Sequence, residues 1–184
     1  TYNGSRSFIR LEDRAGLHDL TIWYPNQSLS SVIPYSATID GAYSSDSVTP
    51  TPTDEMTIKN VNLVNSYVGY DVQSLANRVN IRGLYGSPLS LGMHQLDSAS
   101  VPCYNNVYFS ADYWAESGLP GAPTKTDLQN YLQANATGFR VSSSDNIFAA
   151  EWHVDGYNRG FYFCRPTQKI SHYYNALMLL QLTL

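Results

Sequence analysis

The chain has 184 residues, of which 43% are hydrophobic and 14% are charged, and its net charge is −4. This length suits one ordinary domain with a sizeable core, and the low charge content excludes a coiled coil or a charge-laced helical bundle. Lys and Arg form no block, which argues against nucleic acid as a partner, and no apolar stretch is long enough for a membrane-spanning helix.

Short runs with alternating apolar residues recur along the chain and predict half-buried strands. They lie at 20–22, 61–63, 79–81, 107–109, 152–154 and 161–163. Asx residues stand close before three of these runs, at Asp19, Asn60 and Asn106. A short strand entered repeatedly through an Asx turn indicates a repeating coil.

The spacing of the runs favours parallel coils over hairpins. The distances are 41 residues from Leu20 to Val61, 18 to Val79, 28 to Val107 and 45 to Trp152. The shortest spacing suits one turn of a parallel β-helix, and the longest suit two turns or one turn that carries a loop. Asn-Gly and Asp-Gly dipeptides, which are typical of hairpins, are few. We therefore expect an all-β chain that forms a parallel β-helix section without an internal domain boundary.

Two segments are expected to be insertions, at about 42–55 and 112–138. The first is polar and contains two prolines, which predicts a loop. The second contains one predicted helix over 125–134, with Thr124 as its N-cap and Asp127 as the capping-box partner. Gly138 follows as part of the expected C-cap region. The stripe formed by Leu128, Tyr131 and Leu132 predicts that this helix packs on the flank of the coil.

The ends of the sequence and the two cysteines leave alternatives open. The last ten residues are almost all apolar, so we expect further coils of a longer chain, or another copy, to cover the ends; the alternative is a last strand buried within its own domain. Cys103 and Cys164 are either buried thiols or a disulfide, and their surroundings suggest no metal site.

Several strings, in their order, resemble bacterial secreted proteins of the pectate-lyase-like superfamily, of the kind related to glycoside hydrolase families 28 and 55. They are FIRLEDRAGLHDLTIWYPNQ at 8–27, VIPY at 32–35, TIDG at 38–41, KNVNLVN at 59–65, LYGSPL at 84–89, NVYFSADYW at 106–114 and VDGY at 154–157. The resemblance implies a right-handed parallel β-helix and an extracellular or cell-surface location. Relatives open with a Gly-Asp-x-x-Asp-Asp-Thr segment and a capping helix, which this sequence lacks before Thr1. If the active site of such relatives draws on residues outside this sequence, the chain holds only part of it.

The resemblance also implies a polysaccharide substrate. Its glycosidic bond is cleaved either by hydrolysis, which two carboxyl groups of the enzyme catalyse, or by β-elimination. The alternative is a non-catalytic adhesin, surface fibre or tail-spike-like protein that binds glycans. The catalytic candidates are Asp112 and Glu116, which open the second insertion, and then Asp97. No cofactor is expected, although a lyase would use Ca²⁺.

Aromatic residues next to carboxylates are typical of sugar sites, because rings stack on the C–H faces of sugars and oxygens bind their hydroxyls. The candidates for substrate binding are Tyr113, Trp114, His94, Trp23 and Tyr24. For three of them a structural role competes with the functional one. Trp114 could anchor the insertion, and Trp23 and Tyr24 could pack on the flank. His94 could tune Asp97 or bind substrate.

Overall fold

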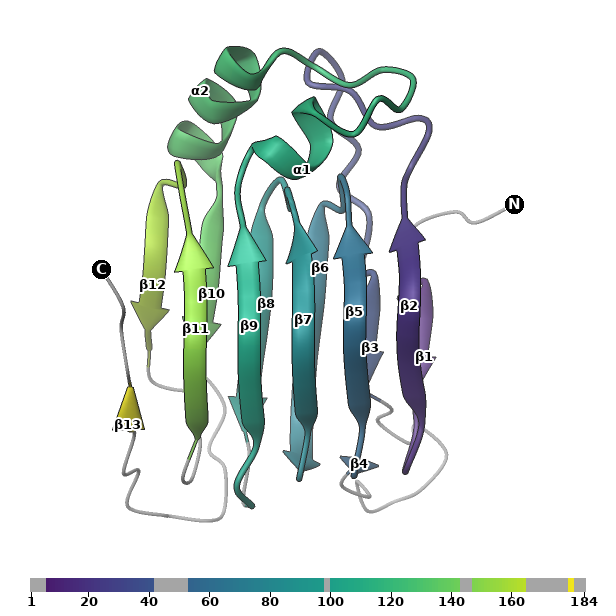
Figure 1. The fold of residues 1–184 in the computed structure, drawn as a ribbon, viewed down its shortest axis with the longest axis vertical. Helices are drawn as coiled ribbons and strands as arrows, with labels where there is room; N and C mark the ends of the chain where they lie inside the picture. The colour runs from purple at the N-terminus through teal and green to yellow at the C-terminus, as the bar shows by residue number, and fades with distance from the viewer. Residues whose placement is uncertain (1–5, 42–52, 98–99, 143–146, 165–178, 181–184) are drawn as a thin grey trace.

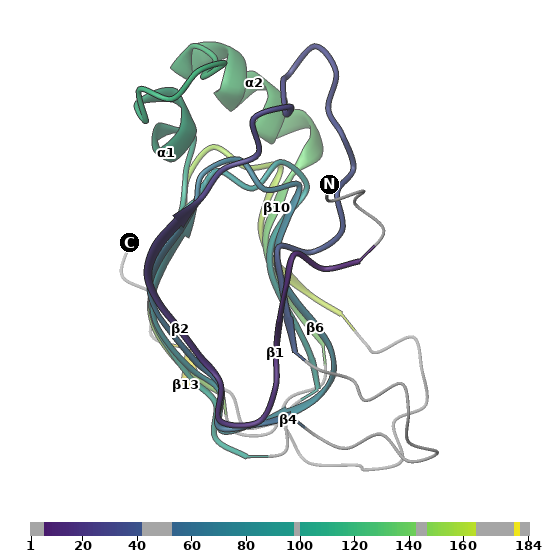
Figure 2. The same ribbon diagram turned by 90° about the vertical axis from the view of Figure 1, so that its right-hand side faces the viewer.

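The computed structural model describes residues 6–41, 53–97, 100–142, 147–164 and 179–180. These residues form two facing sheets, and two short helices lie at one end of the strands (Figures 1 and 2). Sheet A contains β1 (Ile9–Leu11), β3 (Ile39–Gly41), β6 (Val68–Asn77), β8 (Leu91–Asp97), β10 (Thr137–Val141) and β12 (Arg159–Phe163), with β4 (Thr53–Asp54) paired to β6. Sheet B contains β2 (Gly16–Ile22), β5 (Thr57–Leu63), β7 (Asn80–Gly86), β9 (Cys103–Phe109), β11 (Phe148–Val154) and β13 (Leu179–Leu180).

The chain passes back and forth between the two sheets. Apart from the short β4, successive strands along the chain lie alternately in sheet A and in sheet B. Each coil therefore contributes one strand to each sheet. Every pairing between named strands of the described residues is parallel. The prediction of a mostly β chain with parallel strands is confirmed. Figure 2, which looks along the row of strands, shows successive coils following nearly the same outline.

The strand register corrects two predicted spacings and confirms two. Val61 pairs with Leu84, and Leu84 pairs with Val107, so the short repeat is 23 residues in both steps. Val79 is therefore not the counterpart of Val61, and the predicted spacings of 18 and 28 residues are wrong. Leu20 does pair with Val61, and Val107 with Trp152, at the predicted spacings of 41 and 45. The period-two pattern could not distinguish Val79 from Leu84, because both are buried.

The space between the sheets is filled by rows of inward-facing side chains. One row in sheet B consists of Leu20, Val61, Leu84, Val107 and Trp152, which are in register. In sheet A the rings of Phe139 and Phe161 stack at 4.9 Å, and Trp152 of sheet B stacks on Phe139 at 4.6 Å. Burial of such surface stabilises the fold by roughly 25 cal/mol per Å².

One row of sheet B has a left-handed backbone. Its φ values lie between 53° and 92°, and its members are Asp19, Asn60, Gly83, Asn106 and Glu151. Asn, Asp and Gly tolerate this conformation best. The prediction placed Asp19, Asn60 and Asn106 in turns before the strands, but they lie inside the strands and bend them. Asn60 Nδ2 also donates a hydrogen bond to Asp19 Oδ1 at 2.9 Å, which links two members of the row.

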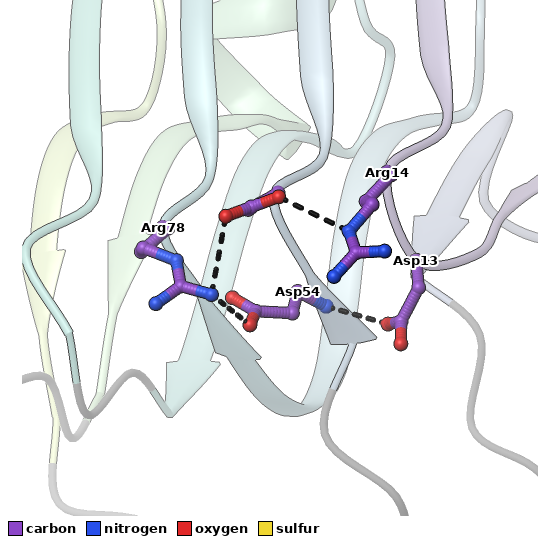
Figure 3. A network of polar contacts seen from close by, with 5 residues as sticks. Asp13, Arg14, Asp54 and Arg78 are labelled. Atoms are coloured by element: carbon purple, nitrogen blue, oxygen red, sulfur yellow. Dashed lines mark hydrogen bonds and ion pairs between the residues drawn. The ribbon is translucent and has the colours of Figure 1, made fainter.

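A second left-handed row lies where the chain enters sheet B, and it carries charges (Figure 3). It contains Arg14, Glu55 and Arg78. Arg14 Nε pairs with Glu55 Oε2 at 3.3 Å, and Arg78 Nη2 pairs with Glu55 Oε1 at 3.2 Å and with Asp54. Asp13 Oδ1 accepts a hydrogen bond from the backbone N–H of Asp54 at 2.8 Å. The charges alternate along the row, so neighbouring coils attract one another at this corner.

A row of glycines runs along sheet A and brings neighbouring strands close together. Gly69, Gly92, Gly138 and Gly160 are in register on β6, β8, β10 and β12. A Cβ on Gly92 would lie 2.5 Å from the carbonyl oxygen of Gly138. The predicted role of Gly138 in a helix C-cap is therefore wrong, because it lies within β10 and serves backbone packing there.

The insertion at 112–138 contains α1 (Asp112–Ala115) and α2 (Lys125–Asn135) before β10 begins at Thr137. The N-cap prediction is confirmed, since Thr124 Oγ1 accepts a hydrogen bond from the Asp127 N–H at 3.1 Å. Leu128 and Leu132 of α2 are buried in a second apolar cluster at the end of the sheets. Most of the other predicted insertion, residues 42–52, lies outside the described residues, and Thr53–Asp54 forms β4.

Candidate functional site

Three tyrosines gather on the outer face of sheet B, where β9 leads into α1. Tyr85 and Tyr108 are in register on β7 and β9 and face away from the core. The ring of Tyr113 from α1 stacks on Tyr85 at 5.8 Å and meets Tyr108 edge-on at 5.7 Å. All three are partly exposed. We call this group the tyrosine surface.

The neighbours of the tyrosine surface hold its rings in place. Asn106, in the left-handed row, donates from Nδ2 to the hydroxyl oxygen of Tyr85 at 2.7 Å. The imidazole of His153 lies 5.1 Å from the ring of Tyr108 and extends the surface onto β11. Burial raises the pKa of Tyr113 to about 12, and the nearby Tyr108, Tyr85 and Asp112 add to this shift. Its phenol therefore stays protonated at neutral pH and can donate a hydrogen bond.

The two first catalytic candidates lie next to this surface and share one cation. Lys125 Nζ is 2.5 Å from Asp112 Oδ1 and 3.9 Å from Glu116 Oε1. The two carboxylate oxygens are therefore at most about 6.4 Å apart, compared with roughly 5 to 9.5 Å between the carboxyl groups of glycosidases. The pKa of Lys125 is raised, chiefly by its hydrogen bond with Asp112. The charge of Asp112 contributes to the raised pKa of Tyr113, so this carboxylate lies near the tyrosine surface.

Trp114 does not face the surface, contrary to the expectation that it contacts substrate. Its side chain is fully buried in the second apolar cluster, together with Leu128 and Leu132 of α2. Its backbone N–H donates to Ser87 Oγ at 3.0 Å, which ties α1 to the coil below. One helical turn places adjacent residues on different sides, so Tyr113 faces out where Trp114 faces in.

Tyr24 is likewise a packing residue. It is buried, its ring stacks on Tyr35 at 4.7 Å, and its hydroxyl lies 3.0 Å from Thr38 Oγ1. Asn65 Oδ1 accepts a hydrogen bond from the backbone N–H of Tyr24 at 2.8 Å. Trp23 is partly buried against the second apolar cluster. Both residues therefore have the flank-packing role that competed with substrate binding.

His94 and Asp97 lie in sheet A, on the other side of the molecule from the tyrosine surface. Asp97 ends β8, where its backbone pairs with Leu75. His94 is buried, and its Nδ1 lies 2.8 Å from Asp71 Oδ1, so Asp71 is a carboxylate partner of this imidazole. The structure thus places His94 on sheet A, apart from Asp112 and Tyr113, which belong to α1 after β9 of sheet B.

Sequence reasoning missed Tyr85 and Tyr108, although a signal was present. Both occupy the outward position two residues after the left-handed residue of their strand, and they are 23 residues apart. The misplaced repeat at Val79 concealed this equivalence. Alignment of the strands on Gly83 and Asn106 would have brought the two tyrosines together.

In the described part of the chain, no group of three or more His, Cys, Asp or Glu side chains could hold a metal ion. Within the same residues, no helix has the length and apolar character needed to cross a bilayer. Cys103 and Cys164 are both free thiols. No protein-family model, curated protein or solved structure matches this chain.

Proposed function

We propose that the protein forms an extracellular or cell-surface right-handed parallel β-helix that binds polysaccharide on its tyrosine surface. The parallel strands and the passage of the chain between two sheets support this fold. The observation that carries the binding proposal is the clustering of Tyr85, Tyr108 and Tyr113 on one outer face. Such partly exposed rings offer flat faces to the C–H groups of sugars, and their hydroxyls offer hydrogen bonds.

The adjoining polar groups suit the hydroxyls of a glycan. Asp112 and Glu116 provide acceptor oxygens, and Lys125 provides N–H donors between them. A chain of sugars lying across β7 and β9 would meet the rings first and the charged groups at α1 second. The mixture of both charge signs favours a neutral polysaccharide over a strongly charged one.

Cleavage of the bound glycan is the second candidate function, and the proximity of Asp112 and Glu116 favours it. Hydrolysis needs one carboxyl group to donate a proton, whereas an ion pair with Lys125 uses the carboxylate form. The arrangement therefore supports binding better than cleavage. A substrate that displaces Lys125 from Glu116, the looser contact at 3.9 Å, would reconcile the two.

The test is binding to a panel of neutral and acidic polysaccharides, measured by affinity electrophoresis or calorimetry. Each ring contributes about 1 kcal/mol, so the double variant Tyr85→Ala, Tyr108→Ala should bind about 30-fold more weakly. Phe148→Ala is the matched control, because Phe148 is an exposed aromatic residue on the same face, near the opposite end of the strands. Equal affinity of the double variant and the control would refute the proposal.

The same incubations decide between binding and cleavage. New reducing ends alone indicate hydrolysis, and reducing ends with the ultraviolet absorbance of an unsaturated product indicate β-elimination. If cleavage occurs, Asp112→Ala or Glu116→Ala should abolish it, and unchanged turnover in both variants would exclude them as catalytic residues. Binding without either product supports the non-catalytic reading.

A further inference from the structure

A serine, a histidine and an aspartate lie in a hydrogen-bonded line on the outer face of sheet A. Asp71 of β6 is opposite His94 of β8 in the strand register, and Ser142 directly follows β10. His94 Nδ1 is 2.8 Å from Asp71 Oδ1, and His94 Nε2 is 3.1 Å from Ser142 Oγ. We propose that these residues form a second site, in which Ser142 is the nucleophile for hydrolysis of a carboxylic ester.

The partners of His94 assign its protons. An ionised Asp71 can only accept hydrogen bonds, so His94 Nδ1 carries the hydrogen and donates it. In the neutral ring Nε2 then has a lone pair, which accepts the hydroxyl hydrogen of Ser142. This is the tautomer that a general base needs in order to take a proton from a serine. The order Asp71, His94, Ser142 thus matches the roles of orienting carboxylate, base and nucleophile.

His94, the middle member of the line, is the most buried of the three. Its side chain is 5% exposed and that of Asp71 13%, and Asp71 and Ser142 are both partly buried residues. The imidazole is held at both nitrogens, so its orientation is set before a substrate arrives. Low exposure also strengthens its interaction with Asp71, because little water screens the pair.

Two further groups adjoin the serine. Cys164 Sγ lies 3.2 Å from Ser142 Oγ, and Arg140 Nε donates to Cys164 Sγ at 3.4 Å. Burial raises the pKa of Cys164, but its hydrogen-bond contacts with Ser142 and Arg140 and the charge of Arg140 outweigh it, so the pKa is lowered overall. Either sulfur or oxygen can donate in the contact with Ser142, and the thiol is the donor when the Ser142 hydroxyl donates to His94. The guanidinium of Arg140 therefore stabilises negative charge beside Ser142. An oxyanion that forms when Ser142 attacks a carbonyl carbon would benefit from the same charge.

The reaction proceeds in two balanced steps. Ser142 Oγ forms a bond to the carbonyl carbon of the ester, and its proton moves to His94 Nε2. Collapse of the oxyanion breaks the ester C–O bond, and the leaving alcohol takes the proton from His94, which leaves an acyl-serine. Water then attacks the acyl carbon and gives a proton to His94, which returns it to Ser142 Oγ as the carboxylic acid departs.

This inference does not depend on glycan binding. The proposed nucleophile is on the outer face of sheet A, whereas the tyrosine surface is on the outer face of sheet B. The apolar core lies between the two sheets and separates the two sites. Variants at Tyr85 and Tyr108 should leave ester hydrolysis unchanged, and variants at Ser142 should leave glycan binding unchanged. Failure of one proposal is therefore distinguishable from failure of the other.

The first experiment needs no variant. The whole protein is incubated with a fluorophosphonate, which phosphorylates an activated serine with loss of fluoride, and the modified peptide is sequenced by mass spectrometry. We expect one adduct, on Ser142. An adduct on Cys164 instead would overturn the assignment of the nucleophile, and no adduct on either residue would overturn the site.

The second experiment measures hydrolysis of p-nitrophenyl acetate across pH. Ser142→Ala and His94→Gln should each lower kcat/KM at least about 100-fold, and Asp71→Asn at least about 10-fold. His18→Gln is the control for hydrolysis by a surface imidazole, because His18 is exposed on the outer face of sheet B. Circular dichroism verifies folding of each variant. A folded Ser142→Ala with the rate of His18→Gln would refute the proposal.

Discussion

The glycine row of sheet A offers a severe test of the close packing between coils. In Gly92→Ala the new Cβ would lie 2.5 Å from the carbonyl oxygen of Gly138 and 2.6 Å from the ring of Phe109, where about 3.4 Å is the ordinary lower limit. The ring can turn, but the carbonyl belongs to β10, which pairs with β8 through its backbone. Relief of the contact therefore requires separation of two strands.

The cost follows from this geometry. Overpacking a core usually costs about 1–3 kcal/mol, and a clash with paired backbone belongs at the upper end of that range. We expect Gly92→Ala to lower the free energy of unfolding by about 3 kcal/mol, a large part of the roughly 5–15 kcal/mol of a typical domain. With an m-value of about 2 kcal/mol/M, the urea midpoint would fall by about 1.5 M.

The assay is urea unfolding followed by circular dichroism, with Gly16→Ala as the matched control. The atoms nearest to a Cβ on Gly16 would be those of the His18 ring, at 3.2 Å, and the carbonyl oxygen of Thr57, at 3.8 Å, and the exposed His18 side chain can move aside. The control should stay within about 1 kcal/mol of the parent protein. Equal midpoints for Gly92→Ala and Gly16→Ala would show that the coils are not packed as closely as described.

Two further predictions concern the left-handed row and the tyrosine surface. Asn60→Ala should lower the free energy of unfolding by about 1–2 kcal/mol, because alanine disfavours a φ of 53° and the hydrogen bond to Asp19 is lost. Asn60→Gly should lower it less, because glycine adopts this φ without strain. Equal losses of stability in urea unfolding of the two variants would contradict this reasoning. The pKa of Tyr113 rises on folding from 10.0 to about 12, so its contribution to stability is complete below pH 10 and is lost as the pH rises to about 12. Tyr113→Phe should flatten the fall in unfolding free energy over this range, and an unchanged slope would contradict it.

Local features of the fold were predictable because they depend on neighbouring residues. Alternating apolar residues indicated the strands, the Thr124 cap indicated α2, and the scarcity of hairpin turns favoured parallel pairing. Asp19, Asn60 and Asn106 were recognised as recurring features, although their place inside the strands was not. A period of two residues shows which side chains face inward, but it does not show which strand positions are equivalent.

The candidate sites were less predictable, because they join residues that are distant in the chain. Asp112 and Glu116 were found through their sequence neighbours, and the structure adds Lys125 and the tyrosines of two adjacent strands. The prediction paired His94 with Asp97, whereas the structure places Asp71 and Ser142 at its ring nitrogens. Ser142 and His94 are separated by 48 positions, and Asp71 and His94 by 23.

The sequence by itself determined the class of secondary structure, the helix of the insertion and the repeated bends, since each of these follows from short-range sterics and hydrogen bonding. Only the tertiary structure decided which residues lie opposite one another. That choice depends on the strand register, and the unequal numbers of residues between strands hide the register from any local pattern. The tyrosine surface on sheet B and the line of Asp71, His94 and Ser142 on sheet A each join side chains from different coils. They therefore form only when the coils stack.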